Sequence, residues 1–132
     1  MKALVEKAGR EDEFFIDSAG IGGWHIGQLP DSRMRRRGAV RGYKFDSRAR
    51  QLSKADFSRF DLILVMDNAN VRAVTAMAST LEERDKVRML GSYMTAHAGV
   101  NEIPDPYYGD DSDFDYALDL IEDACAGLLA EL

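Results

Sequence analysis

The stretch DLILVMD, residues 61–67, decides the fold. Five apolar residues stand in a row between two aspartates, which is typical of a short strand that is buried on both faces. Such strands occur in parallel sheets that helices cover. Asp67 or Asn68 can then cap a helix, because both side chains accept hydrogen bonds from free backbone amides. The stretch therefore predicts a strand followed by a helix within an α/β domain.

Two other segments are predicted to be strands. FFIDSAGI, residues 14–21, is apolar and runs into a glycine-rich loop, and KVRMLG, residues 86–91, is a further short strand. We expect helices over residues 1–8 before Gly9, 30–38 with Gly38 as the stop, 53–60 after a Ser53 to Asp56 capping box, 68–77, from a Thr80 to Glu83 capping box, and after residues 110–113. Strands that alternate with helices predict one α/β domain over residues 1–132, with right-handed crossovers.

Composition argues against several classes of protein. The 132 residues are 45% hydrophobic and 30% charged, as in ordinary globular domains, and no apolar run reaches the length of a membrane span. The net charge of -6 argues against a general nucleic-acid binder, since phosphate contacts need clustered positive charge. The arginines of residues 33–41 are the local exception, and we interpret them as a solvated helix face. The single cysteine cannot form an internal disulfide, so we expect a cytoplasmic protein.

A second informative stretch is IPDPYYG, residues 103–109. Each proline fixes its own φ, and Pro106 also keeps Asp105 out of the helical region, so the carboxylate is placed on a stiff corner. A general acid needs such fixed placement. Tyr107 and Tyr108 add flat apolar walls with polar tips, which suit an aryl group. The alternative interpretation is an acidic surface turn beside a half-buried tyrosine.

The other reactive side chains are interpreted as structural. Cys125 belongs to the apolar stripe of the last helix, so we expect it to be an inert core residue. His25 and His97 are isolated in the sequence and lack the spacing of a metal site or a triad. The predicted stripe comprises Phe114, Ala117, Leu118, Ile121, Cys125 and Leu128.

The acidic group at residues 110–115 invites a calcium interpretation. It lacks the glycine and the distal glutamate of an EF-hand loop. Negative charge at the start of a helix is favourable without any metal. We therefore predict a helix cap and no metal site.

The pieces of a site should gather at the carboxyl ends of the parallel strands. Ser18, the loop around Trp24, Asp67 and the Asp105 loop would all lie there. This convergence favours a functional role for Asp105 over a plain surface turn.

Eight short segments occur in one order along the chain: DSAG at 17–20, WHIG at 24–27, PD at 30–31, ARQ at 49–51, DF at 56–57, DLILVMD at 61–67, LGSY at 90–93 and DPYYG at 105–109. Together they resemble the low molecular weight protein-tyrosine phosphatases. The resemblance covers nearly the whole chain, and the order of the matches makes it specific.

The resemblance implies a flavodoxin-like three-layer sandwich with a small parallel sheet. It also implies hydrolysis of phosphotyrosine or aryl phosphates through a cysteinyl-phosphate, without a metal or other cofactor. Asp105 would protonate the leaving phenol and later assist water. Tyr107 and Tyr108, with Trp24 across the cleft, would hold the substrate ring, and Ser18 would shape the phosphate loop.

The departures from the family pattern are equally informative. The family begins with a strand that leads into a Cys, five residues, Arg-Ser loop, and no such loop occurs in these 132 residues. We expect an N-terminally truncated chain, through a downstream start codon or artificially, that lacks the central first strand and is inactive by itself. Ser47 stands where relatives often have histidine. The strands at 14–21 and 62–66 would then expose apolar edges, so we expect self-association or direct closure of the two strands.

Two alternatives come from other functional classes. One is a non-catalytic module that binds phosphotyrosine or a partner protein through the aromatic cleft. The other is a receiver-like signalling domain with Asp67 as phosphoacceptor, which acetyl-phosphate labelling would detect. Asn68-Ala69-Asn70 lacks the proline usual after such an aspartate, and no acidic pair ends a first strand, so the second alternative is only an analogy of fold.

Overall fold

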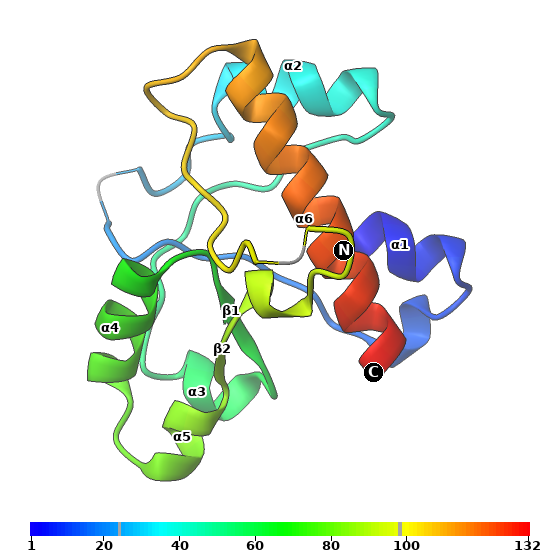
Figure 1. Cartoon of the computed structure of the whole chain (residues 1–132). Coiled ribbons are helices and arrows are strands. Elements are labelled where there is room, and N and C mark those ends of the chain that lie inside the picture. The colour runs from blue at the N-terminus through cyan, green and yellow to red at the C-terminus, as the bar shows by residue number, and fades with distance from the viewer. Residues whose placement is uncertain (24, 98) are drawn as a thin grey trace.

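The computed structural model describes residues 1–23, 25–97 and 99–132. Its elements in chain order are α1 (Lys2–Lys7), η1 (Glu11–Glu13), α2 (Ser32–Val40), α3 (Asp56–Arg59), β1 (Ile63–Val65), α4 (Asn68–Met77), α5 (Leu81–Asp85), β2 (Val87–Met89), η2 (Leu90–Tyr93) and α6 (Asp111–Glu131). Figure 1 shows the strand pair between α4 on one side and the long helix α6 on the other.

The sheet of the described residues consists of β1 and β2 in parallel. Ile63 pairs with Val87 and Val65 pairs with Met89. The predicted strands at 61–67 and 86–91 are therefore confirmed in their central residues. The expected side-chain caps of α4 and α5 are present as well, because Asp67 Oδ1 accepts from the Asn70 amide at 2.8 Å and Thr80 Oγ1 from the Glu83 amide at 3.1 Å. The predicted Thr80 to Glu83 box is half formed, since Glu83 Oε1 accepts from the Ser79 amide at 3.2 Å and not from that of Thr80.

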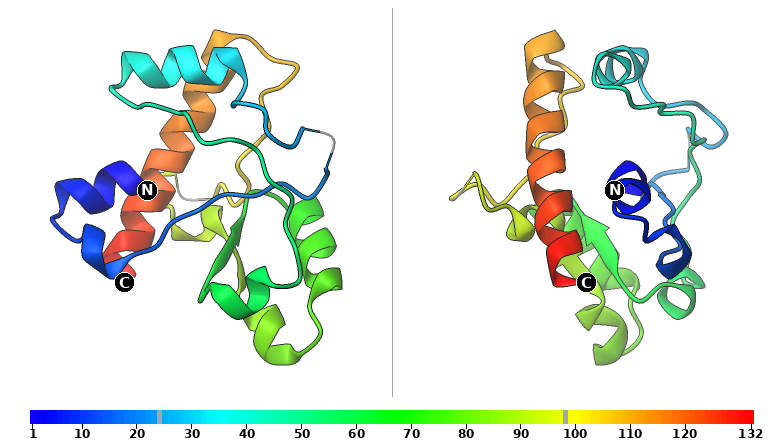
Figure 2. Two further views of the ribbon diagram at one scale, coloured as in Figure 1. Left: turned by 180° about the vertical axis from the view of Figure 1, so that it is seen from behind. Right: turned by 90° about the vertical axis from the view of Figure 1, so that its right-hand side faces the viewer.

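The strand predicted at residues 14–21 is wrong for the described structure. The backbone is extended at Phe14, but in this segment only Gly20 forms a bridge, with Gln51. Strand assignment requires ladder hydrogen bonds, and the sheet of the described residues offers no neighbour to residues 14–19. In Figure 2 this segment, drawn in blue, crosses the molecule without an arrow. Direct closure onto β1, one of the expected outcomes, does not occur in the described residues.

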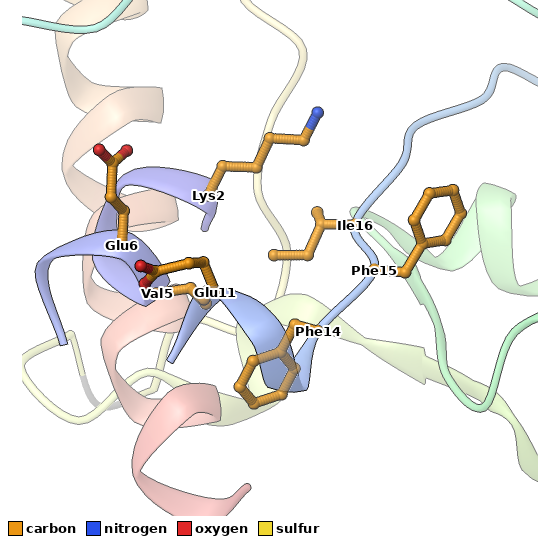
Figure 3. A pocket seen from close by; sticks show the side chains of 7 residues that line it. All are labelled: Lys2, Val5, Glu6, Glu11, Phe14, Phe15 and Ile16. Carbon is orange, nitrogen blue, oxygen red and sulfur yellow. The ribbon is translucent and has the colours of Figure 1, made fainter. Parts of the chain in front are cut away.

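A cavity of about 440 Å³ lies between α1 and the segment around Phe15. Its walls are formed by Lys2, Val5, Glu6, Glu11, Phe14, Phe15 and Ile16 (Figure 3). Phe15 is 72% exposed, and its ring stacks on Phe60 with centroids 5.7 Å apart. The extended segment thus leaves apolar surface uncovered beside α1.

Two apolar clusters form the core. One joins α6 to η2 and to the loop that precedes α6. It contains Leu90, Ile103, Leu120, Ala124, Cys125 and Leu128. The other places Val65 of β1 against Phe57 of α3 and Val74 of α4. Cys125 is buried, as predicted, and of the expected stripe only Ile121 is merely half-buried. Leu120 and Ala124, which the stripe did not include, are also buried because η2 covers a second strip of α6.

Helix α2 differs from its prediction at its end. Asp31 caps it and the helix begins at Ser32, later than the predicted residue 30; Gly38 does not stop it, and the helix continues to Val40. Gly38 is instead buried inside the helix, because the ring of Phe45 packs where a side chain would otherwise lie. The turn after the helix uses Gly42, whose φ of +87° favours glycine.

The arginines of residues 33–41 form only in part the solvated face that we predicted. Arg35 is exposed, but Arg36, Arg37 and Arg41, which directly follows α2, pair with carboxylates on the first half of α6, which lies beside α2 in Figure 1. The pairs are Arg36 with Asp111 at 2.7 Å, Arg37 with Asp115 at 2.8 Å, and Arg41 with Asp119 and Glu122 at 2.9 and 2.5 Å. Charge complementarity therefore joins the two helices.

The capping box predicted from Ser53 to Asp56 is also different. Helix α3 begins only at Asp56, and Asp56 is buried with 1% exposure. Its Oδ2 accepts from the Ser53 amide at 2.8 Å and from Arg50 at 3.1 Å. The carboxylate therefore fixes the chain before the helix and does not close a reciprocal cap.

None of the helices in the described parts of the chain combines the length and the apolar character that crossing a lipid bilayer requires.

Candidate active site

The Asp105 loop starts at the carboxyl end of β1. Ile103 is 3% exposed, and its amide donates to the carbonyl of Met66 at 2.8 Å. This bond joins the loop to the residue that follows the strand. The two prolines then fix the backbone on either side of Asp105. The loop thus leaves the sheet where ligands bind in open α/β folds.

Local hydrogen bonds hold the Asp105 carboxylate. Its Oδ1 accepts from the Tyr107 amide at 3.0 Å, which is the geometry of an Asx turn. The Gly109 amide closes the next turn by donating to the Pro106 carbonyl at 2.8 Å. The carboxyl group is exposed to solvent yet fixed in direction, as a general acid requires.

The two tyrosines form an aromatic corner beside this carboxylate. The rings of Tyr107 and Tyr108 meet edge to face, with centroids 5.0 Å apart and planes at 86°. Tyr107 is 57% exposed and Tyr108 is 97% exposed. Large aromatic surfaces that project so far into solvent can contact the ring of a ligand.

The acidic group after the loop is a helix cap. Asp110 Oδ1 accepts from the amides of Ser112 at 3.0 Å and Asp113 at 3.3 Å, and Asp113 Oδ2 accepts from the Asp110 amide at 3.0 Å. The pKa of Asp110 lies below its ordinary value because the Ser112 hydroxyl and these amides stabilise its charge. The predicted cap is confirmed, and the described residues contain no group of three potential ligands that could hold a metal ion.

Ser18 lies at a different cavity. Its amide donates to Asp17 Oδ1 at 2.8 Å, and Asp17 Oδ2 accepts from Arg50 at 3.0 Å. The pKa of Asp17 is lowered by the Ser18 amide first and by Arg50 second. The cavity, of about 240 Å³, is lined by Ser18, Ala19, Gly20, Gln28, Leu29, Pro30, Ser47, Arg48 and Ala49, none of which belongs to the Asp105 loop.

Trp24, the third predicted ring contact, lies outside the described residues. The structure therefore joins Asp105 to Tyr107 and Tyr108 in one loop, whereas Ser18 and Ser47 line the other cavity. Arg50 was missed by the sequence interpretation. It links Asp17, next to Ser18, to the buried Asp56.

His97, which stands alone in the sequence, has a tertiary partner in the structure. Its Nδ1 lies 2.8 Å from Asp123 Oδ2, and the same carboxylate accepts from the amides of Thr95, Ala96 and His97. These donors hold the pKa of Asp123 well below its usual range, with the His97 side chain as the largest cause. The pair fixes the loop after η2 against α6 and lies apart from the Asp105 turn in sequence. His25 is paired locally, with Gln28 Oε1 at 3.1 Å.

The sequence was compared with protein families and with known proteins. The family model for low molecular weight phosphotyrosine protein phosphatases matches residues 1–132. The chain belongs to this family. A low molecular weight protein-tyrosine-phosphatase of Streptomyces coelicolor is 43% identical over 130 residues, which are 98% of this chain and 79% of the relative. A low molecular weight phosphotyrosine protein phosphatase of Sus scrofa is 34% identical over 136 residues, covering 99% of this chain and 82% of the relative.

The structure of the chain also superposes on a solved structure of a tyrosine phosphatase. A crystal structure of protein tyrosine phosphatase from Entamoeba histolytica, with Hepes in its active site, superposes with a TM-score of 0.93 at 35% identity. The match covers 98% of this chain and 82% of that chain. Family membership makes the protein a relative of hydrolases that act on phosphotyrosine, and the chain spans about four fifths of each of these three relatives.

Proposed function

We propose that this member of the phosphatase family, in a form that also carries the family's cysteine loop, hydrolyses phosphotyrosine in proteins, or small aryl phosphates, with Asp105 as its general acid and then its general base. The observation that carries the proposal is the placement of Asp105. Its carboxylate is held by the Tyr107 amide, between two prolines, on a loop that begins at the end of β1. The leaving phenolate would take its proton from this carboxyl group, and the carboxylate would then activate water.

The tyrosines would select for an aryl group. The exposed rings of Tyr107 and Tyr108 stand directly after Asp105, so a bound substrate ring would have its phenolic oxygen near the acid. Trp24 would contribute the opposite wall. Ser18 would support the phosphate loop from the Asp17 and Arg50 side.

The 132 residues by themselves do not supply a nucleophile. The single cysteine, Cys125, is 5% exposed in the apolar cluster on α6, and no arginine follows it. An attacking cysteine must be an accessible thiolate beside groups that bind the phosphate. The proposal therefore holds that this chain alone is inactive, and that activity needs the family's first strand and Cys, five residues, Arg loop. We call a chain extended upstream by these elements the loop-bearing form.

The test is a pair of substitutions in the loop-bearing form. Asp105→Asn keeps the shape of the side chain and its acceptor oxygen but removes its proton. We expect it to lower kcat for phenyl phosphate, whose leaving group needs a proton, by about 100-fold or more, the typical contribution of a general acid. The matched control is Asp111→Asn, since Asp111 lies six residues further along and pairs with Arg36 on the surface. Equal kcat values in the two variants would contradict the role of Asp105.

A further inference from the structure

Arg33 connects α2 to the Asp105 loop. Its Nη2 donates to the carbonyl of Tyr107 at 2.8 Å, and its Nη1 donates to the carbonyl of Gly109 at 3.2 Å. These carbonyls flank Tyr108, so one guanidinium group spans the turn that carries both rings. In the sequence Arg33 is 74 residues away from Tyr107, so this is a tertiary contact between separate elements.

The guanidinium is itself held in place. Arg33 Nε and Nη2 donate to the two carboxylate oxygens of Asp31 at 3.1 and 2.9 Å, in a two-point contact. Asp31 in turn caps α2, because its Oδ1 accepts from the Arg33 amide at 2.8 Å. The Arg33 side chain is 32% exposed, and the pair is therefore partly shielded from water. A flat group with several fixed donors is needed to bind a carboxylate and two carbonyls together.

Two aromatic rings complete the surroundings of this cation. The guanidinium carbon lies 4.6 Å from the centroid of Phe114 and 5.7 Å from that of Tyr107. Phe114 is 2% exposed in the first turn of α6. The cation thus contacts the ring of Tyr107 as well as its carbonyl, and it rests on the buried ring that follows the loop.

We infer that Arg33 is a positioning residue that fixes the Tyr107–Gly109 turn, and through it the direction of the Asp105 carboxylate. The link is the Tyr107 amide, which donates to Asp105 Oδ1 while the carbonyl of the same residue accepts from Arg33. The inference rests on the proposed role of Asp105. A lysine has the charge but not the planar fork, so Arg33→Lys should release the turn without removing the cation.

The first experiment measures the turn directly in the 132-residue chain. Hydrogen exchange of the amides, followed by NMR, should accelerate by about tenfold at Tyr107 and Gly109 in Arg33→Lys and stay unchanged in the buried parts of α6. Arg36→Lys is the matched control, because Arg36 is on the same helix and pairs with Asp111 without touching the turn. Unchanged exchange at Tyr107 and Gly109 would overturn the inference.

The second experiment uses the loop-bearing form and compares two leaving groups. The phenolate of phenyl phosphate needs a proton on its oxygen in order to leave. The more acidic para-nitrophenol leaves as its anion with little help from an acid. A misplaced acid should lower kcat/KM, which reports the step that releases the phenol, by about 10-fold to 100-fold for phenyl phosphate. For the para-nitrophenyl ester kcat/KM should fall by less than about threefold. Arg36→Lys should change neither rate.

Asp105→Asn separates the two proposals. If it shows the leaving-group effect and Arg33→Lys lowers kcat/KM for both esters equally, the inference about Arg33 is wrong and the role of Asp105 stands. If Asp105→Asn shows no leaving-group effect, the proposed role of Asp105 is wrong. The inference is supported if both variants show the leaving-group effect and if Arg33→Lys also accelerates amide exchange at the turn.

Discussion

At the scale of single residues, Asp56 is the carboxylate that the protein buries most deeply. It is 1% exposed, and the oxygen Oδ1 has no hydrogen-bond partner among the described residues. Burial alone would raise its pKa, but the hydrogen bonds from Arg50 and from the Ser53 amide outweigh burial and hold the pKa below its ordinary value. The charge of Asp56 is therefore maintained by one arginine and one amide.

Removing that arginine should be costly. Arg50→Met would leave a buried charge with only the Ser53 amide and hydroxyl, and we expect the free energy of unfolding to fall by about 3 kcal/mol. The measurement is urea denaturation at pH 7. Arg48→Met is the control, because Arg48 is exposed and its side chain donates to the Gly27 carbonyl rather than to a buried carboxylate. Equal stabilities of the two variants would contradict the importance of the buried pair.

The Asp123 carboxylate predicts a dependence of stability on pH. Its pKa in the folded protein is lowered, so its charged form contributes stability above the unfolded pKa of about 4, and this stability is lost as pH falls towards the folded pKa. Asp123→Asn should therefore destabilise the protein at pH 7, and its difference from the parent chain should shrink below pH 4. Thermal unfolding between pH 3 and pH 7 measures this.

Glu131→Gln on the same helix is the control for that series, since Glu131 is exposed. Its difference from the parent chain should stay small at every pH. A difference for Asp123→Asn that is the same at pH 3 and at pH 7 would show that the charge of Asp123 is not what holds the 95–97 loop.

At the scale of elements, α6 and η2 pack closely together at Gly127. A side chain at this position would overlap the backbone carbonyl of Tyr93, which cannot move aside as a flexible side chain could. Glycine inside a helix costs about 1 kcal/mol relative to alanine. The close approach therefore outweighs the helix preference at this position.

Gly127→Ala should reverse the usual helix ranking. We expect it to lower the free energy of unfolding by about 2 kcal/mol, because the methyl group forces α6 away from η2. At the neighbouring exposed position, Ala126→Gly should cost about 1 kcal/mol through helix preference alone. Urea denaturation of both variants measures these changes in the free energy of unfolding. Stabilisation by Gly127→Ala would contradict the packing of these two elements.

The elements that the sequence predicts well are those with local causes. The apolar runs of β1 and β2 and the caps at Asp67 and Asp110 depend on residues within one short segment. The segment at 14–21 has the composition of a strand, but a strand also needs a neighbour, which composition does not reveal. The Asp105 turn could likewise be predicted, because two prolines fix it.

Long-range pairs could not be predicted from the sequence. Arg33 and Tyr107 are separated by 74 residues, and His97 and Asp123 by 26 residues. The spacing of these residues along the chain does not show that they pair, because only tertiary packing brings them together. The arginines of α2 were interpreted as a solvated face for the same reason.

At the scale of the whole molecule, the apolar surface around Phe15 predicts self-association of the 132-residue chain. In the described residues β1 pairs only with β2, and residues 14–19 pair with no strand. Unpaired backbone and exposed apolar side chains favour pairing with another chain. Light scattering after size exclusion should show dimers or larger species as concentration rises.

A charge on the segment should suppress this association. Phe15→Lys places a lysine at the exposed ring position and should shift the chain towards monomer, since charges protect strand edges. Val40→Lys is the control, because Val40 is 70% exposed at the end of α2, away from this segment. A parent chain that stays a uniform monomer at all concentrations would contradict the prediction.

The most direct test of the account is hydrolysis of para-nitrophenyl phosphate by the 132-residue chain, measured beside the loop-bearing form. The account predicts turnover only in the loop-bearing form, since the 132 residues provide the acid and the aromatic walls but no accessible thiolate. Turnover by the 132-residue chain itself would contradict the assignment of the nucleophile to the loop. The absence of turnover in both forms would contradict the proposed phosphatase activity.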